Sequence, residues 1–149
     1  MSKFFVLEPE VPGELGPGTV LHRTPSGLPV ATRIEYRFTD WLGDDLITSH
    51  PCFVVTQRLG EALRTGGFTG IRLETLDVTL SLEFLERHPE WKLPMFAWLQ
   101  VPGRPGLDDF GISTENCLIV SEKALTTLQT LNLNYCGIEK YTIGMDSEL

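Results

Sequence analysis

Two pairs of adjacent aspartates, Asp44 with Asp45 and Asp108 with Asp109, are the side chains of this sequence with the clearest capacity for chemistry. If the four carboxylates converge in the fold, they could hold a divalent cation, because hard cations take several oxygen ligands. The pairs lack the alternate-residue spacing of a calcium-binding loop, however. Two other roles are open: the aspartates could cap turns or lie on a solvated acidic face, or they could form an acidic patch that binds a basic partner.

Other residue types that commonly carry catalysis form no familiar arrangement. The sequence contains no Gly-x-Ser-x-Gly elbow, no phosphate-binding loop, and no cysteine with a histidine partner in a known motif. Its three histidines lie in HRTP, SHPC and RHPEW, which are loop contexts typical of solvated side chains. We therefore expect no catalytic residue, no metal site and no cofactor, and we expect that the protein is not an enzyme.

The three tryptophans are candidates for protein contacts. Trp98 lies in the apolar run PMFAWLQV and is expected in the core. Trp41, in TDWLGDD, and Trp91, in HPEWKLP, have polar neighbours. Large aromatic residues near carboxylates are typical anchors of protein interfaces, and core packing is the alternative for both.

Composition limits the classes of protein to which the chain can belong. Its 149 residues, 42% hydrophobic and 21% charged, fit a single domain, 1–149, with one core. The net charge of −8 and the scattering of the twelve Lys and Arg residues argue against nucleic-acid binding. Three cysteines without metal-ligand spacing predict neither a disulfide framework nor a zinc site. The amino-terminal apolar stretch is too short for a signal peptide, and no run is long enough to span a membrane, so we expect a cytoplasmic protein.

The sequence pattern around each aspartate pair occurs twice in the chain. Segments 44–75 and 108–142 each contain an Asp pair, an apolar residue, a cysteine, three β-forming residues, a Thr or Ser, a helix-like stretch and a Gly-Ile extended segment. Such a match predicts two copies of one supersecondary unit, each a strand, a helix N-cap, a helix and a second strand. Aligning Cys52 with Cys117 superposes Val55 on Val120, Thr56 on Ser121, Arg58 on Lys123 and Leu63 on Leu128.

The remaining sequence predicts further elements around the two units. The expected strands are 4–8, 30–38 and 94–101, and the expected helix is 80–87, with Leu82 and Leu85 as its apolar residues. The segment EPEVPGELGPGTV, at 8–20, is expected to be a loop because of its proline and glycine content. We predict an α+β fold with a mixed, mostly antiparallel sheet, two or three short helices and an internal pseudo-repeat of strand-helix-strand units.

Several of these motifs are similar to those of a known group of proteins. The segments KFFVLEP, WLGDDLI, CFVVTQRLGEAL and CLIVSEKALTTL, the last two each followed by Gly-Ile, resemble bacterial immunity proteins of polymorphic toxin systems, including the myxobacterial-type immunity domains. The resemblance covers roughly 40–76 and 108–143, whereas the Pro- and Gly-rich segment 9–29 departs from the pattern. It implies a cytosolic, non-enzymatic protein that binds one cognate toxin domain and blocks its active site or a movement it needs.

On this basis we expect an immunity protein that neutralises a secreted toxin domain by protein–protein interaction. The expected contact residues lie in two acidic loops, 39–50 and 103–116, and are Trp41 as anchor with Asp44, Asp45, Asp108 and Asp109 as charges. The expected partner is basic, because many toxin domains that act on nucleic acids are basic and complementary charge speeds association; neither nucleic acid nor a membrane is expected. One alternative is a small-ligand or divalent-metal-binding domain, which could be an enzyme, with its site between the two repeats. Another is a structural or homodimeric domain in which the repeat serves packing alone.

Overall fold

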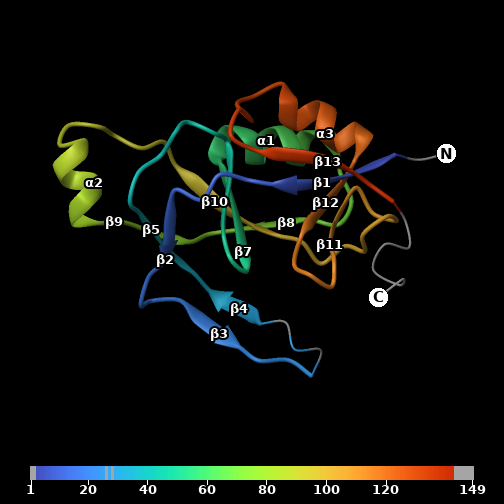
Figure 1. Ribbon diagram of the computed structural model, residues 1–149, viewed down its shortest axis with the longest axis horizontal. Helices are drawn as coiled ribbons and strands as arrows, with labels where there is room; N and C mark the ends of the chain where they lie inside the picture. Colours follow the sequence, from blue (N-terminus) through green and yellow to red (C-terminus); the bar gives the residue numbers. More distant parts are fainter. Residues whose placement is uncertain (1–2, 26, 28, 143–149) are drawn as a thin grey trace.

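Two four-stranded antiparallel sheets form the larger part of the fold (Figure 1). The computed structural model describes residues 3–25, 27 and 29–142. One sheet has the order β11 (Phe110–Ile112), β12 (Leu118–Ser121), β1 (Phe4–Glu8) and β13 (Gly137–Tyr141). The other has the order β6 (Leu46–Ser49), β7 (Cys52–Thr56), β10 (Phe96–Gln100) and β8 (Arg72–Glu74).

Two smaller sheets and three helices complete the described part of the chain. In the three-stranded sheet, β5 (Glu35–Phe38) pairs antiparallel with β2 (Gly13–Leu15) and parallel with β9 (Asp77–Leu80). A separate hairpin consists of β3 (Val20–His22) and β4 (Val30–Arg33). The helices are α1 (Gln57–Gly66), α2 (Leu82–Arg87) and α3 (Glu122–Gln129). The prediction of an α+β fold with mostly antiparallel pairing and short helices is confirmed.

The helices α1 and α3 begin and connect as their sequences predict. The hydroxyl of Thr56 accepts the N–H of Leu59 at the start of α1, and the hydroxyl of Ser121 accepts the N–H of Ala124 at the start of α3. Gly67 ends α1 with a φ of 66°, a conformation that glycine adopts without strain. Helix α1 joins β7 to β8 on either side of β10, α3 joins β12 to β13 on either side of β1, and the two helices lie side by side (Figure 1).

The strand β7 is buried on both faces, which explains its continuous apolar run. Phe53 and Val55 of β7 face a core shared by both four-stranded sheets and by α1 and α3. Cys52 and Val54 of the same strand face a second core, which contains Trp98 and the aromatic residues of β5 and α2. The strand therefore separates two hydrophobic cores, and the prediction that Trp98 lies in the core is confirmed.

Three predictions about the fold are corrected. The strands form four sheets in place of one, because alternation of residue types identifies a strand without identifying its neighbour. The segment 8–20, expected to be a loop, contains β2, which lies at a sheet edge where Pro and Gly are tolerated. The strand expected over 30–38 is divided at Ile34 into β4 and β5. No helix in the described residues is long and apolar enough to cross a membrane.

Candidate functional site

Asp45 is a buried carboxylate that joins the two helical units. Its Oδ1 accepts hydrogen bonds from the Thr56 hydroxyl and from Nε of Arg58, the latter at 2.7 Å. Its Oδ2 accepts from Nη2 of Arg58 at 2.8 Å and from the backbone N–H of Asn132 at 2.9 Å. The arginine contact is bidentate, a strong geometry for a charged pair. Since Thr56 caps α1 and Asn132 follows α3, this Asp45 clasp ties the start of one helix to the chain beyond the other.

Asp44 is fully buried beside it and binds the same segment of chain. Its Oδ1 accepts the N–H of Asn134 at 2.8 Å, and its Oδ2 accepts the N–H of Tyr135 at 2.7 Å. Its carbonyl oxygen accepts the indole N–H of Trp41 at 2.9 Å. A partner could bind the carboxylate of Asp44 or Asp45 only by displacing these hydrogen bonds. The role of both residues in partner binding therefore stays a prediction. Their structural role is to hold the chain that follows α3.

The hydrogen bonds of Asp45 keep its carboxylate ionised. Burial alone would raise the pKa of Asp45, but the bonds from Arg58, Thr56 and Asn132 outweigh it and hold the pKa below its usual value. A buried charge is tolerated when it is paired and its oxygens are occupied. The Asp45 clasp therefore requires the charged form of this side chain.

Glu10 is a buried carboxylate that the sequence analysis missed. Its Oε2 accepts the N–H of Leu42 at 2.7 Å, and its Oε1 accepts the N–H of Asp44 at 3.4 Å. Burial raises the pKa of Glu10, although these two hydrogen bonds oppose the rise. Glu10 thus supports the loop that carries Trp41. No local signal indicates this, because its partners are 32 and 34 residues away.

Asp109 repeats part of this arrangement nearer the surface. Its Oδ1 accepts the Ser121 hydroxyl at 2.8 Å, and its Oδ2 accepts the backbone N–H of Thr69 at 3.0 Å. Ser121 caps α3 and Thr69 follows α1, so this Asp109 clasp also joins the two units. Lys123, which aligns with Arg58, lies over the ring of Phe68 at 5.0 Å. Burial would raise the pKa of Asp109, but the bonds from Thr69 and Ser121 hold it below its usual value.

Asp108 caps a turn, one of the roles considered from the sequence. Its Oδ2 accepts the N–H of Arg104 at 2.7 Å. The two aspartate pairs therefore bind different segments, and residues 3–25, 27 and 29–142 contain no group of three or more His, Cys, Asp or Glu side chains placed to hold a metal ion. The described residues therefore offer no candidate centre for the metal-binding alternative.

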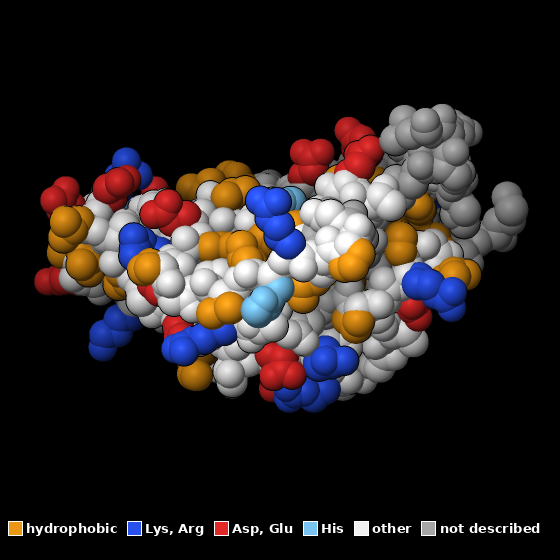
Figure 2. Space-filling view, turned by 90° about the horizontal axis from the view of Figure 1, so that it is seen from below, with side chains coloured by type: hydrophobic (Ala, Val, Ile, Leu, Met, Phe, Trp, Pro, Cys, Tyr) orange, Lys and Arg blue, Asp and Glu red, His pale blue; other side chains and the backbone are white. Residues whose placement is uncertain are grey.

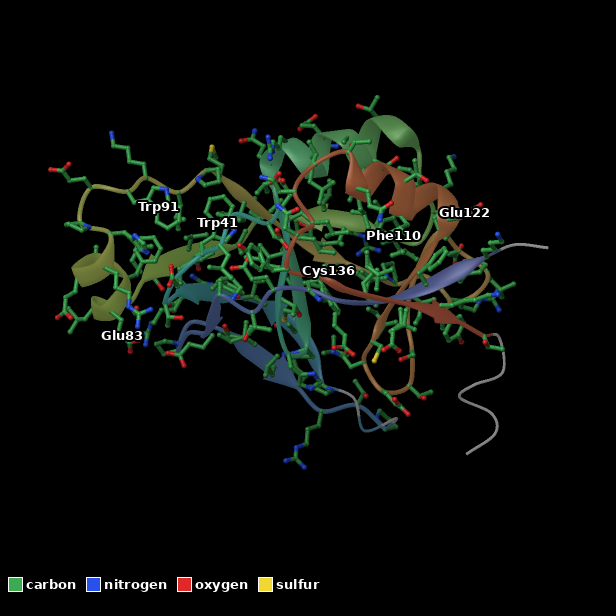
Figure 3. All side chains as sticks on the ribbon, turned by 45° about the horizontal axis from the view of Figure 1, so that its top comes forward. Trp41, Glu83, Trp91, Phe110, Glu122 and Cys136 are labelled. Carbon is green, nitrogen blue, oxygen red and sulfur yellow. The ribbon has the colours of Figure 1, made fainter. Side chains whose placement is uncertain are left out.

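Trp41 is half-buried at the edge of an aromatic cluster. Its ring stacks on Trp91 with centroids 5.8 Å apart and meets the ring of Phe96 edge-on at 5.6 Å. Trp91 stacks in turn on Phe84 of α2 at 5.7 Å. Figure 3 shows Trp41 and Trp91 together between α2 and the start of α1. Both roles considered for Trp41 are thus compatible with its position: it packs in the core and borders the surface.

A surface cavity of about 590 Å³ opens beside Trp41. Trp41, Asp45, Arg58 and Met95 are among the residues that line it. Its size lies within the usual range for pockets that receive a ligand or an inserted side chain. The cavity brings two of the five predicted contact residues to one place, and Asp108 and Asp109 are not among its lining residues. Met95, which the sequence analysis assigned to a strand, is largely exposed at its rim.

His88 differs from the solvated side chain expected of it. Its Nε2 lies 2.9 Å from Oδ1 of Asp40, and its ring packs edge-on against Trp91 at 4.4 Å. Arg87 binds the other oxygen of Asp40 at 3.2 Å. The hydrogen bond from the Trp41 N–H, followed by that from His88, holds the pKa of Asp40 below its usual value. These contacts fix the end of α2 against the loop that carries Trp41.

Compared with known proteins, the chain matches no family model and no curated protein.

Proposed function

We propose that the protein is an immunity protein that acts in the cytoplasm, where it binds and neutralises one cognate secreted toxin domain of basic charge. It performs this role by protein–protein interaction and not by catalysis. The net charge of −8 supports a basic partner, because charge complementarity speeds encounter and disfavours wrong partners. The observation that carries the proposal is the matched placement of the two motif-bearing segments that resemble immunity proteins.

The two segments have corresponding neighbours in the fold. In the first segment, the hairpin of β6 and β7 is followed by α1 and then by β8, and β10 lies between β7 and β8 in the sheet. In the second segment, the hairpin of β11 and β12 is followed by α3 and then by β13, and β1 lies between β12 and β13. The cap residue donates its N–H to the Asp carbonyl in each: Thr56 to Asp45 at 2.9 Å, and Ser121 to Asp109 at 2.8 Å. We infer that the segments form an internal repeat, and this correspondence supports the resemblance because the second aspartate and the hydroxyl cap of the motif have the same roles in both segments.

The clasps also suggest how the motif relates to partner binding. The Asp, the hydroxyl cap and the basic residue of the first segment are engaged within the fold, so a motif of this kind specifies the scaffold. Discrimination of one toxin from another then depends on exposed residues outside the motif. Of the residues predicted for contact, Trp41 and Asp108 are half-buried and belong to neither clasp, so a partner can reach them with both clasps closed.

Coexpression with the gene product encoded directly upstream tests the proposal. The carboxy-terminal domain of that product is expressed alone and with this protein, and cell growth is measured. Rescue of growth, together with co-purification of the two proteins, is the expected result. A toxic domain that this protein neither binds nor neutralises would rule out cognate immunity.

A further inference from the structure

The strand β9 and the helix α2 form one end of the molecule (Figure 1). Several of the apolar side chains of these two elements are exposed. Four of them occur within eight residues, and together with Trp91 they define what we call the α2 surface: Val78, Leu80, Leu82, Leu85 and Trp91. Leu82 is 76% exposed and Leu85 is 45% exposed. Single exposed leucines are common in soluble proteins, whereas several exposed apolar side chains on adjoining elements indicate an interaction site.

The geometry of α2 explains why its leucines face outward. Phe84 is fully buried, and its ring packs against Trp91 and His88 in the second core. Positions three residues apart share a helix face, so Leu82 and Leu85 lie together, away from the face that buries Phe84. The helix therefore uses one face for the core and leaves the other available for contact.

The strand β9 extends this surface at the edge of its sheet. Val78 pairs with Tyr36 and Leu80 with Phe38 of β5. Tyr36 and Phe38 are completely buried, whereas Val78 and Leu80 are exposed. Since paired residues on neighbouring strands point to the same side, the core continues to the surface here. Among the described residues β9 has no neighbour on its outer edge.

The charges around the α2 surface are mainly negative and available. Glu83, Glu86 and Glu90 are exposed and form no ion pair within the described residues. Of the two cations in the segment 82–92, Arg87 is bound to Asp40 and Lys92 is exposed. Figure 2 shows hydrophobic side chains at this end of the molecule with Asp and Glu side chains, and some Lys and Arg side chains, beside them. An apolar centre with an acidic rim is complementary to a basic protein surface that also presents apolar side chains.

We infer that the α2 surface is the contact for the basic toxin domain, an inference that rests on the proposed function. Leu82 and Leu85 form its apolar centre, and Glu83 and Glu86 attract the basic surface of the partner. Trp91 connects this surface to Trp41, the anchor predicted from the sequence, through their stacked rings. The contact therefore extends from α2 toward the cavity beside Trp41 and leaves both aspartate clasps closed.

Two pairs of substitutions in the full chain test the inference. The probe is the purified carboxy-terminal domain of the upstream product, and its Kd and association rate are measured with each variant. The double variant Leu82→Ser, Leu85→Ser is expected to raise the Kd at least about tenfold, as loss of central apolar contacts does. The variant Glu83→Lys, Glu86→Lys is expected to slow association, with the effect shrinking at high salt because exposed charges are screened.

Leu21→Ser is the matched control, because Leu21 of β3 is 45% exposed, as Leu85 is, and lies outside both acidic loops. Leu107→Ser tests the competing surface, the acidic loop 103–116, in which Leu107 is 71% exposed. We expect both variants to leave the Kd unchanged. If Leu107→Ser weakens binding and the Leu82, Leu85 variant does not, the contact surface is that loop; the inference is overturned while the proposed function stands. If the unsubstituted protein does not bind the probe, the proposed function and the inference fail together. Thermal unfolding of each variant verifies that these surface changes leave the fold intact.

Discussion

The Asp45 clasp and the Asp109 clasp use the same bonds at different depths. Each carboxylate accepts a cap hydroxyl from its own unit and a backbone N–H from the other unit. Asp45 is only 1% exposed and has in addition a bidentate arginine, whereas Asp109 is half-buried and has Lys123 in the aligned position. The difference shows one way of burying an acidic group: Arg58 donates two hydrogen bonds to Asp45, and a buried carboxylate must have its oxygens occupied.

Removing each carboxylate in turn is expected to show the largest difference between the clasps. Asp45→Ala should lower the free energy of unfolding by about 3 kcal/mol, since the Thr56 hydroxyl and the Asn132 N–H lose a buried acceptor. Asp109→Ala should lower it by about 1 kcal/mol, because water can replace an acceptor that is half exposed. Urea unfolding followed by circular dichroism measures both, and equal losses would contradict the ranking by depth.

Acid should weaken both clasps in the same direction. The pKa of Asp45 and that of Asp109 are lower in the folded protein than in the unfolded chain, so each adds stability that is fully present above the unfolded value, about 3.9. This stability is lost as the pH falls through the folded pKa. We expect the free energy of unfolding to decrease below about pH 4, and to decrease less in Asp45→Asn than in the unsubstituted protein. Parallel pH profiles of the two proteins would show that Asp45 is not the group responsible.

Making the second clasp resemble the first should have the smallest effect. Lys123→Arg supplies a planar guanidinium that can bind Asp109 through two hydrogen bonds and still stack on Phe68. We expect a gain in the free energy of unfolding of less than about 1 kcal/mol, because exposed ion pairs contribute little. The reverse change, Arg58→Lys, is expected to lower stability, and thermal unfolding of both variants gives the comparison. A loss of stability in Lys123→Arg would mean that the ammonium on Phe68 matters more than a pair with Asp109.

Local features of the fold could be predicted because local interactions determine them. Thr56 and Ser121 are caps because their hydroxyls bind N–H groups three residues later, and Gly67 ends α1 because of its own conformational freedom. The buried strand at β7 follows from consecutive apolar residues with access to two cores. In each case the residue and its cause lie within a few positions of each other.

Features that depend on distant partners could not be predicted. The hydrogen-bond partners of the Asp44 carboxylate are 90 and 91 residues away in the sequence. From the sequence alone, the pair of Asp44 and Asp45 therefore resembles an acidic surface patch, although both residues are buried. Leu82 and Leu85 read as the apolar face of a helix, whereas Phe84 is the residue that α2 buries. Periodicity indicates that a short helix has an apolar face, but the depth of each side chain depends on what packs against it.

The spacing of the Asp45 clasp has a consequence for the order of events during protein synthesis. Asp45 leaves the ribosome long before Asn132, which lies 87 residues later and supplies one of its hydrogen bonds. Until that residue emerges, the nascent chain contains a carboxylate that cannot be buried with all its bonds made, which disfavours early closure of the core shared by both units. The final fold is therefore expected to close after translation has passed Asn132, with hydrophobic residues of the first unit exposed to chaperones until then.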